Sequence, residues 1–218
     1  MISIIDNFKK SVDCWNIEID NNIYLCSLSH INILSEKEKC KFYSFKKEED
    51  KKRFLISHIA LRSIINSYTQ TPLDLINFRY NEYGKMYLDC NNLNLYFNLS
   101  HSKGKSLIVF SDNEIGVDLE YVDKFTNINE IVDFTFSESE RILLQESDIR
   151  QRYAVFYDIW TKKEAYLKAL STGLVDNLYE ICTEKIKSNF KKIKLNKYIA
   201  NIATKDKIKT VYIKQYKI

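Results

Sequence analysis

Apolar residues recur at helical spacing in two parts of the chain. In the first part, the pattern predicts a short basic helix from Ser35 to Phe45, with a capping box of Ser35 and Glu38, and a longer helix from about Glu48 to Tyr68. In the second part, it predicts three helices, at Ile128–Phe134, Ser137–Glu146 and Ile149–Leu170.

Alternating apolar and polar residues predict strands after each group of helices. The first strands are expected at Asn77–Tyr80, Lys85–Leu88, Leu93–Asn98, Ser106–Ser111 and Glu114–Tyr121. Asp112 and Asn113, between the last two, are typical of a tight hairpin, and from Leu178 onward the chain alternates again. The order of elements predicts an α+β fold with two similar halves, residues 1–110 and 111–218, each a long helix packed on a small antiparallel sheet.

The composition indicates a packed protein of the cell interior. Hydrophobic residues make up 45% of the 218 residues and aromatic residues 13%, which excludes a disordered chain. The five cysteines include no C-x-x-C pair, so we expect no disulfide framework, no zinc site and a reducing compartment. Met1 to Lys10 lack the apolar region of a secretory signal, and no apolar run reaches the ~18 residues of a membrane span. The predicted location is cytoplasmic, without membrane attachment.

Charge is unevenly distributed along the chain. The net charge is +4, yet the segment from Lys185 to Ile218 holds 11 lysines and one acidic residue. These lysines alternate with apolar residues, which favours the exposed face of strands protected against edge-to-edge pairing. A surface for phosphate or an acidic partner is the alternative. A nucleic-acid-binding role would leave the acidic residues described next without a purpose, so we expect no nucleic acid as partner.

Two acidic residues stand on one face of a predicted strand. In E-I-G-V-D-L-E-Y, Asp118 and Glu120 are two positions apart, which places their Cα atoms roughly 6.5–7 Å apart on the same side. Two like charges at this spacing repel unless water or a cation lies between them. An ordinary solvent-facing strand surface is the alternative interpretation.

A third acidic residue continues an apolar stripe of the last predicted helix. The stripe contains Trp160, and the same face carries Glu164 and Lys168, while Lys163 lies beside it. An exposed Glu-to-Lys pair is the simpler interpretation. It is harder to maintain for a pair that extends a buried aromatic stripe.

Ser100 and His101 end a strand before a short loop of Lys103 to Lys105. They do not form a hydrolase dyad, because neighbouring strand residues point apart and no G-x-S-x-G surrounds Ser100. Small hydroxyls, an imidazole and free loop amides suit phosphate binding instead.

Three motifs together resemble the signature of surfactin-type 4′-phosphopantetheinyl transferases. They are F-N-L-S-H-S (97–102), G-V-D-L-E (116–120) and W-T-K-K-E-A-Y-L-K (160–168), and their order and spacing match that family. Glu82–Lys85 and Phe136–Glu140 also match, and the resemblance extends from about Ser35 to Leu174. It implies a pseudo-twofold monomer whose two halves enclose a cleft for coenzyme A.

The resemblance also implies roles for individual residues. The residues that match the family's acidic Mg²⁺ ligands are Asp118, Glu120 and Glu164. Those that match its coenzyme A contacts are Ser100 and His101 at the 3′-phosphate, Lys163 and Lys168 in the cleft with Lys168 next to the pyrophosphate, Lys85 near the adenine, and the upstream basic residues Lys39 and Arg53. Met86 departs from the proline usual in the family after the hairpin lysine.

The activity implied is Mg²⁺-dependent transfer of 4′-phosphopantetheine from coenzyme A to a serine of an apo acyl or peptidyl carrier protein, with release of 3′,5′-ADP. This is the reaction of a holo-[acyl carrier protein] synthase. Glu164 and Lys168 are the predicted catalytic residues, Glu164 as the base that accepts the serine proton. A module of the same fold that binds coenzyme A or a nucleotide without turnover is the alternative.

Overall fold

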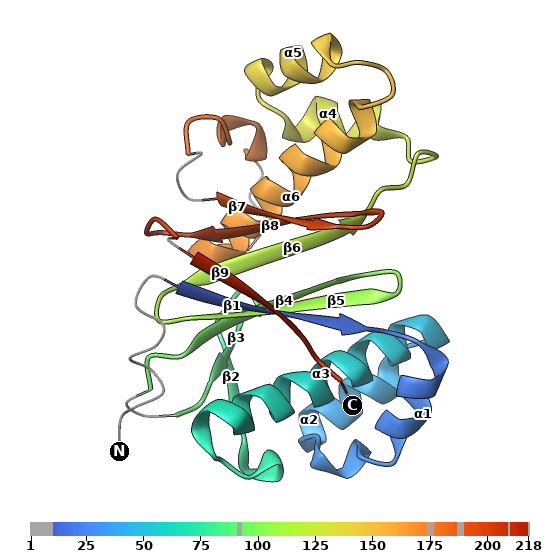
Figure 1. The fold of residues 1–218 in the computed structure, drawn as a ribbon, viewed down its shortest axis with the longest axis vertical. Coiled ribbons are helices and arrows are strands. Elements are labelled where there is room, and N and C mark those ends of the chain that lie inside the picture. The colour runs from blue at the N-terminus through green and yellow to red at the C-terminus, as the bar shows by residue number, and fades with distance from the viewer. Residues whose placement is uncertain (1–10, 91–92, 174–176, 187–189, 209, 218) are drawn as a thin grey trace.

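A computed structural model describes residues 11–90, 93–173, 177–186, 190–208 and 210–217. The expectation that Met1 to Lys10 carry no secretory signal falls on residues outside the described part of the chain. The structure has four layers: a long helix, two sheets and a second long helix (Figure 1).

The first sheet belongs mainly to the first part of the chain. Its strand order is β4-β5-β1-β9, and a separate hairpin is formed by β2 and β3. The strands are β1 (Ser11–Glu18), β2 (Phe78–Tyr80), β3 (Met86–Leu88), β4 (Tyr96–Ser102), β5 (Lys105–Ser111) and β9 (Thr210–Gln215). The helices beside them are α1 (Asn21–Leu28), α2 (Glu36–Ser44) and α3 (Glu48–Thr69), with short 3₁₀ turns at Ile31–Ile33 and Leu73–Leu75.

The second sheet has the order β6-β8-β7 and is antiparallel throughout. Its strands are β6 (Ile115–Tyr121), β7 (Phe190–Leu195) and β8 (Tyr198–Thr204). The helices of this part are α4 (Ile128–Thr135), α5 (Glu138–Glu146) and α6 (Arg152–Leu170), with a 3₁₀ turn at Leu178–Glu180. The predicted α+β class is confirmed, as are the predicted helices to within a few residues.

Two expectations about the strands are wrong. The first sheet is mixed, because β9 leaves the second part of the chain and pairs in parallel with β1. Asp112 and Asn113 do not form a hairpin, because β5 and β6 belong to different sheets, and the tight turn is at Lys103–Gly104 between β4 and β5. Local turn preference and alternation do not identify the partner of a strand, so neither outcome follows from the pattern alone.

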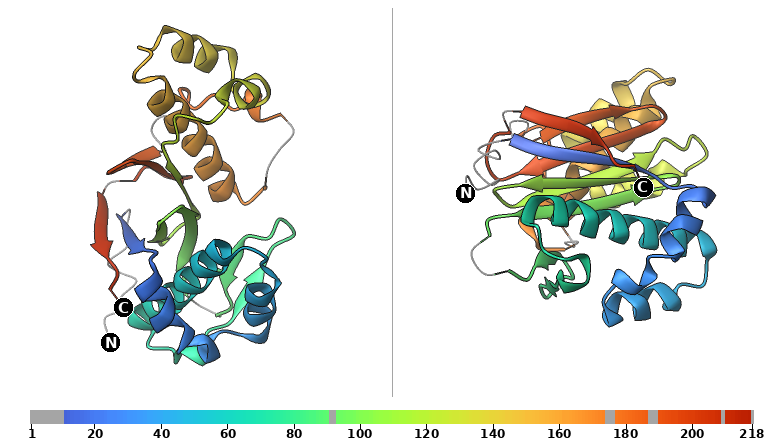
Figure 2. Two further views of the ribbon diagram at one scale, coloured as in Figure 1. Left: turned by 90° about the vertical axis from the view of Figure 1, so that its right-hand side faces the viewer. Right: turned by 60° about the horizontal axis from the view of Figure 1, so that its bottom comes forward.

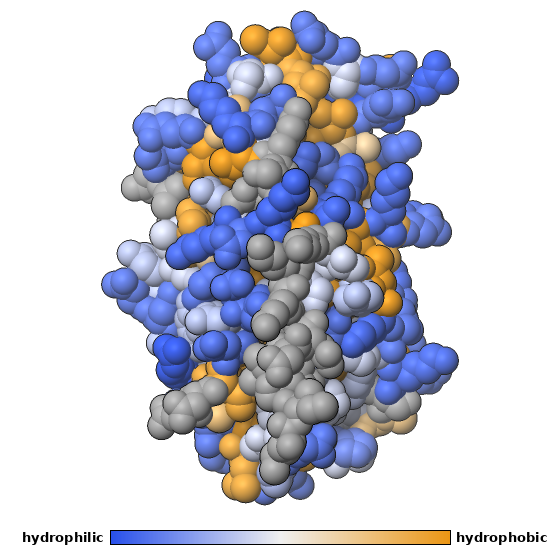
Figure 3. Space-filling view, turned by 60° about the vertical axis from the view of Figure 1, so that its left-hand side comes forward, coloured by the Kyte–Doolittle hydropathy of each residue, from blue (hydrophilic) through white to orange (hydrophobic). Residues whose placement is uncertain are grey.

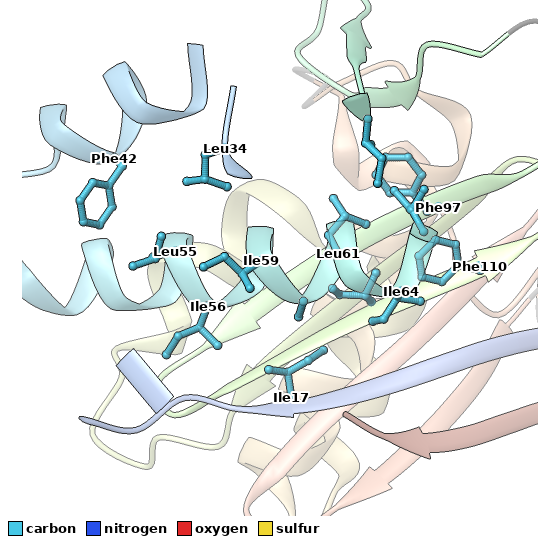
Figure 4. Close-up of a cluster of buried hydrophobic side chains, with 14 of the residues drawn as sticks. Ile17, Leu34, Phe42, Leu55, Ile56, Ile59, Leu61, Ile64, Phe97 and Phe110 are labelled. Atoms are coloured by element: carbon cyan, nitrogen blue, oxygen red, sulfur yellow. The ribbon is translucent and has the colours of Figure 1, made fainter. Parts of the chain in front are cut away.

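Four clusters of buried apolar side chains hold the layers together. Apolar side chains of α3 pack on the first sheet, as Figure 4 shows around Ile56, Ile64 and Phe110. A second cluster, which includes Val109 and Val117, fills the space between the sheets. A third lies mainly among α4, α5 and α6, and a small fourth one lies between α6 and β8. Apolar burial of this kind contributes about 25 cal/mol per Å² and dominates the stability of such layers.

The predicted capping box at the start of α2 is confirmed, and it has a second role. Ser35 and Glu38 cap each other's backbone, and Glu38 is also buried against α3, where it accepts hydrogen bonds from His58 and Arg62. Burial by itself raises the pKa of Glu38, but hydrogen bonds from His58 and Arg62 outweigh it, and the pKa is lowered to about 2. The carboxylate is therefore ionised at neutral pH and ties α2 to α3.

The second part of the chain has a similar capping-box glutamate that is buried against the long helix. Ser137 and Glu140 cap α5, and the buried Glu140 pairs with Lys163 of α6 at 2.9 Å. Thr183 also donates to Glu140, from its backbone N–H at 2.9 Å and its hydroxyl at 2.7 Å. In each part a short helix is thus joined to the long helix by a buried, capped carboxylate.

The two sheets meet along β4 and β6 without forming a backbone ladder. Instead, alternate side chains of β4 accept hydrogen bonds from the backbone of β6. The three bonds run from Val117 N–H to Asn98 Oδ1 (2.9 Å), from Leu119 N–H to Ser100 Oγ (3.2 Å) and from Tyr121 N–H to Ser102 Oγ (3.0 Å). This junction sets the register between the strand with the Ser-His motif and the strand with the paired carboxylates.

The lysine-rich tail forms strands, as predicted. On β7, Ile193 is buried while Lys191, Lys192 and Lys194 are exposed, which supports the interpretation as a solvated strand face. β7 and β9 each lie at one edge of their sheet, and hydrophilic residues cover much of the coloured surface in Figure 3. No helix among the described residues is long and apolar enough to span a membrane.

Candidate active site

The acidic pair of β6 lies where the two sheets meet. Asp118 is 5% exposed, and its Oδ1 accepts hydrogen bonds from Ser100 Oγ at 3.0 Å and from Lys168 Nζ at 2.6 Å. Glu120, two residues on, accepts a hydrogen bond from Ser102 Oγ at 2.9 Å. The alternating hydroxyls of β4 therefore hold both the backbone and the carboxylates of β6.

The helix α6 brings Glu164 and Lys168 to the same place. It crosses β6 at Gly116, so closely that a Cβ on this residue would lie 2.5 Å from Ala169 N and 2.9 Å from Lys168 Cβ. The close approach lets Lys168 reach Asp118 and the carbonyl of Val117, the latter at 3.3 Å. Position 116 requires glycine because there is no room for a Cβ atom, and not because of its backbone conformation.

The three carboxylates influence one another electrostatically. Burial and the charge of Asp118 raise the pKa of Glu120 to about 6, with a smaller contribution from Glu164, against the opposing effects of Ser102 and Lys168. Burial also raises the pKa of Glu164; Asp118 adds to this and Lys168 opposes it. The three carboxylates thus carry more negative charge than the single positive charge of Lys168 can neutralise.

The donor types suit a hard cation such as Mg²⁺, which prefers carboxylate oxygens. Asp118 Oδ2 is buried and has no hydrogen-bond partner among the described residues. Asn201, directly opposite Asp118 in the register of β8, also has a buried Oδ1 without a partner there. Cross-strand partners project from the same face of a sheet, so two oxygen acceptors are left unpaired on one side of β6 and β8. In the described residues, however, no three acidic, histidine or cysteine side chains stand together as a ready-made metal cage, and Lys168 is the cation on Asp118.

A pocket of about 780 Å³ opens beside this cluster, and both parts of the chain line it. Glu164 and Lys168 of α6 form one wall; α2, α3, β4 and the β2–β3 hairpin supply the others. The residues of those other walls include Lys37, Lys41, Phe54, His58, Tyr80, Tyr83, Gly84, Lys85, Phe97 and Asn98. The pocket is large enough for a nucleotide-sized ligand.

Several of these wall residues were not singled out by sequence reasoning. Phe54 and His58 stack with ring centroids 3.9 Å apart, and Lys37 lies 4.0 Å from the ring of Tyr80. Phe54 belongs to the apolar stripe of α3, and such a stripe predicts residues of the hydrophobic core instead of a pocket wall. Asn98 was quoted only as part of a motif, and its role at the junction depends on β6, a strand 19 residues away.

Other predicted site residues occupy different positions. Lys163 is fully buried, paired with Glu140, and donates to the carbonyls of Leu178 and Ile181, away from the pocket. Lys39 pairs with Glu36 and Arg53 with Asp50, and neither is among the described residues that line the pocket. The family resemblance implied a place in the cleft for Lys163, and its helical position beside the stripe does not show which distant carboxylate will cover it.

His101 points away from the β6 junction and is exposed. Partial desolvation lowers its pKa, and the positive charges of Arg53 and Lys168 act in the same direction. Its imidazole is therefore neutral at physiological pH and lies within electrostatic reach of these two cations. The structure thus brings His101, Arg53 and Lys168 into one region.

Both parts of the chain match models of one protein family. Residues 25–113 match a model described as 4'-phosphopantetheinyl transferase, N-terminal, and residues 114–216 match the 4'-phosphopantetheinyl transferase superfamily.

Curated relatives carry the same description. The chain is similar to 4'-phosphopantetheinyl transferase gsp of Aneurinibacillus migulanus, with 29% identity over 72% of this chain and 63% of the relative. It is also similar to HetI of Nostoc sp., with 33% identity over 65% and 61%, and to Sfp of Bacillus subtilis, with 31% identity over 64% and 60%. The matches thus span about three fifths of the length of these relatives.

Proposed function

Because the chain belongs to the 4′-phosphopantetheinyl transferase superfamily, we propose that it transfers the 4′-phosphopantetheine group of coenzyme A to a serine of an apo carrier protein. The observation that carries this proposal is the meeting of Asp118, Glu120, Glu164 and Lys168 beside a pocket lined by both parts of the chain. The products are a phosphopantetheinyl-serine and 3′,5′-ADP.

The pocket is the proposed site for coenzyme A, and the two halves are related by an approximate twofold axis. Supporting this are the matching pairs of short and long helices, each pair tied by a capped, buried carboxylate. Because both halves are in one chain, the pocket needs no second copy, and we expect a monomer.

Asp118, Glu120 and Glu164 would hold Mg²⁺. Their oxygen donors, the unpartnered Oδ2 of Asp118 and the mutual repulsion of the carboxylates suit such an ion. When bound, Mg²⁺ would neutralise negative charge on the pyrophosphate of coenzyme A.

The chemistry breaks the bond between the β-phosphorus and the oxygen of the 3′,5′-ADP leaving group. The serine oxygen forms the new bond to phosphorus, and Glu164, which faces the pocket, accepts the serine proton. Lys168, 30% exposed at the pocket wall, stabilises the charge on the leaving phosphate.

His101 is the proposed contact to the 3′-phosphate, assisted by Ser100, Arg53 and Lys39. The Ser100 hydroxyl already donates to Asp118 and accepts from Leu119, so His101 is the freer of the two motif residues. We expect His101→Ala to weaken binding of coenzyme A by about 10- to 150-fold, because a charge-assisted hydrogen bond is worth about 1.5–3 kcal/mol. Binding of 3′-dephospho-coenzyme A should change little, and calorimetric titration with both ligands measures the difference. An equal loss for both ligands would refute this placement.

Release of 3′,5′-ADP tests the proposed reaction. It should appear when the protein, coenzyme A, Mg²⁺ and an apo carrier protein are combined, and not with a carrier whose acceptor serine is alanine. Release that is independent of the carrier serine would show hydrolysis instead of transfer.

A further inference from the structure

The hairpin of β2 and β3 forms one wall of the pocket, and a lysine at its tip is fully engaged with the other half of the molecule. Lys85 is 7% exposed, and its Nζ donates to Glu114 Oε2 at 2.6 Å, Lys168 O at 2.8 Å and Ile115 O at 3.2 Å. An ammonium group has three N–H donors, so these three acceptors use all of them. Lys85 thus has no donor left for a ligand phosphate in this arrangement.

The three acceptors belong to the elements that carry the proposed chemistry. The Lys168 carbonyl is one of the last four of α6, which have no partner within the helix and carry the negative end of its dipole. Ile115 begins β6, the strand of Asp118 and Glu120. A lysine from the first half therefore caps the helix of Glu164 and fastens it to the start of the acidic strand.

Further hydrogen bonds surround this lysine. The Tyr87 hydroxyl lies 3.1 Å from Glu114 Oε1 and 2.8 Å from Ser171 Oγ, at the C-terminus of α6. Asn81 donates to the carbonyl of Ser171 at 3.0 Å, and its Oδ1 accepts the backbone N–H of Lys85 at 2.8 Å. Burial lowers the pKa of Lys85, and Glu114 offsets only part of this effect, so the buried ammonium depends on its carboxylate partner.

The geometry points to Lys85, Glu114, Tyr87, Ser171 and Asn81 as a clasp that positions the hairpin wall of the pocket against α6. In this arrangement Lys85 is a positioning residue and not a direct contact of coenzyme A near the adenine, and Glu114 is its essential partner. Glu114 stands two residues before the G-V-D-L-E motif, and the family resemblance implies no role for it. The part of this inference that concerns coenzyme A rests on the proposed function.

Glu114→Gln separates the two roles of Lys85, because they predict opposite signs. If Lys85 contacted coenzyme A directly near the adenine, removing the competing carboxylate would free the lysine and lower the KM for coenzyme A. If the clasp positions the wall, Glu114→Gln and Lys85→Met each raise this KM roughly fivefold or more with kcat changed less than about threefold. The double variant should then be no worse than either single variant. A lower KM for Glu114→Gln, or additive losses in the double variant, would overturn the inference.

Unfolding measurements test the clasp independently of any reaction. In a double-mutant cycle with urea, Lys85→Met and Glu114→Gln should couple by about tenfold in the unfolding equilibrium constant. The matched control is the exposed pair of Lys103 and Asp123, 3.4 Å apart, which should couple less than about twofold. If Lys85→Met does not fold, Tyr87→Phe with Ser171→Ala provides the second cycle. If the effects of Lys85→Met and Glu114→Gln on unfolding are additive, the clasp is excluded even if the protein transfers phosphopantetheine. If the two effects are coupled but no transfer is observed, only the proposed reaction is refuted.

Discussion

Asp118→Asn is expected to lower the rate of transfer by roughly three orders of magnitude while leaving the protein folded. The amide keeps an oxygen to accept the hydrogen bond from Ser100, so the junction between β4 and β6 survives. It removes the negative charge on which Lys168 and the proposed cation depend. It also relieves the repulsion that raises the pKa of Glu120, so the free energy of unfolding should stay equal or rise slightly.

The matched control is Asp158→Asn on α6. Asp118 is a buried carboxylate paired with Lys168, and Asp158 is a half-buried one paired with Lys162 at 2.6 Å and Lys192 at 2.8 Å. It contacts β7 and β8 instead of lining the pocket. This variant should retain most of the transfer rate. If Asp118→Asn unfolds while Asp158→Asn does not, the role of Asp118 is structural and the proposed site is wrong.

Gly116→Ala is expected to destabilise the protein by more than about 3 kcal/mol, or to prevent folding. The added Cβ would collide with the Ala165 carbonyl and lie 2.5 Å from Ala169 N, so the α6 backbone would have to move away from β6. Flexible side chains cannot absorb this clash, because two of the three nearest atoms belong to the helix backbone. Any folded population would have Glu164 and Lys168 displaced and should transfer poorly.

Gly104→Ala provides the comparison for this second prediction. The nearest atoms to a Cβ there are Ile19 O at 3.7 Å and Tyr198 Oη at 3.8 Å, which are ordinary contacts. Urea unfolding should therefore show a change within about 1 kcal/mol. Equal stability of the two variants would contradict the close packing of α6 on β6.

Much of the site follows from periodicity and motif order. Alternation on β6 places Asp118 and Glu120 on one side, and the structure has Val117 and Leu119 in the core between the sheets, as that alternation requires. Helical spacing places Glu164 and Lys168 on one flank of α6. That this flank faces β6 depends on contacts across some fifty residues of chain, such as Lys168 to Asp118, which no local pattern encodes. The family resemblance supplied this link.

The residues that sequence reasoning misplaced have partners from distant segments. Lys163 and Lys168 both lie on α6, yet one is covered by Glu140 of α5 and the other reaches Asp118. The family resemblance implied a cleft position for both, and helical position alone does not show which distant carboxylate each one meets. Similarly, alternation predicted the strand β9 but not its parallel pairing with β1, since a strand pattern contains no information about its neighbour.

The most direct measurement is the intact mass of an apo carrier protein after incubation with this protein, coenzyme A and Mg²⁺. We expect a mass increase of one phosphopantetheine group on the acceptor serine, and loss of this adduct in excess chelator. No adduct on any apo carrier protein, or an adduct that forms equally well in the chelator, would contradict a metal-assisted transfer at Asp118, Glu120 and Glu164.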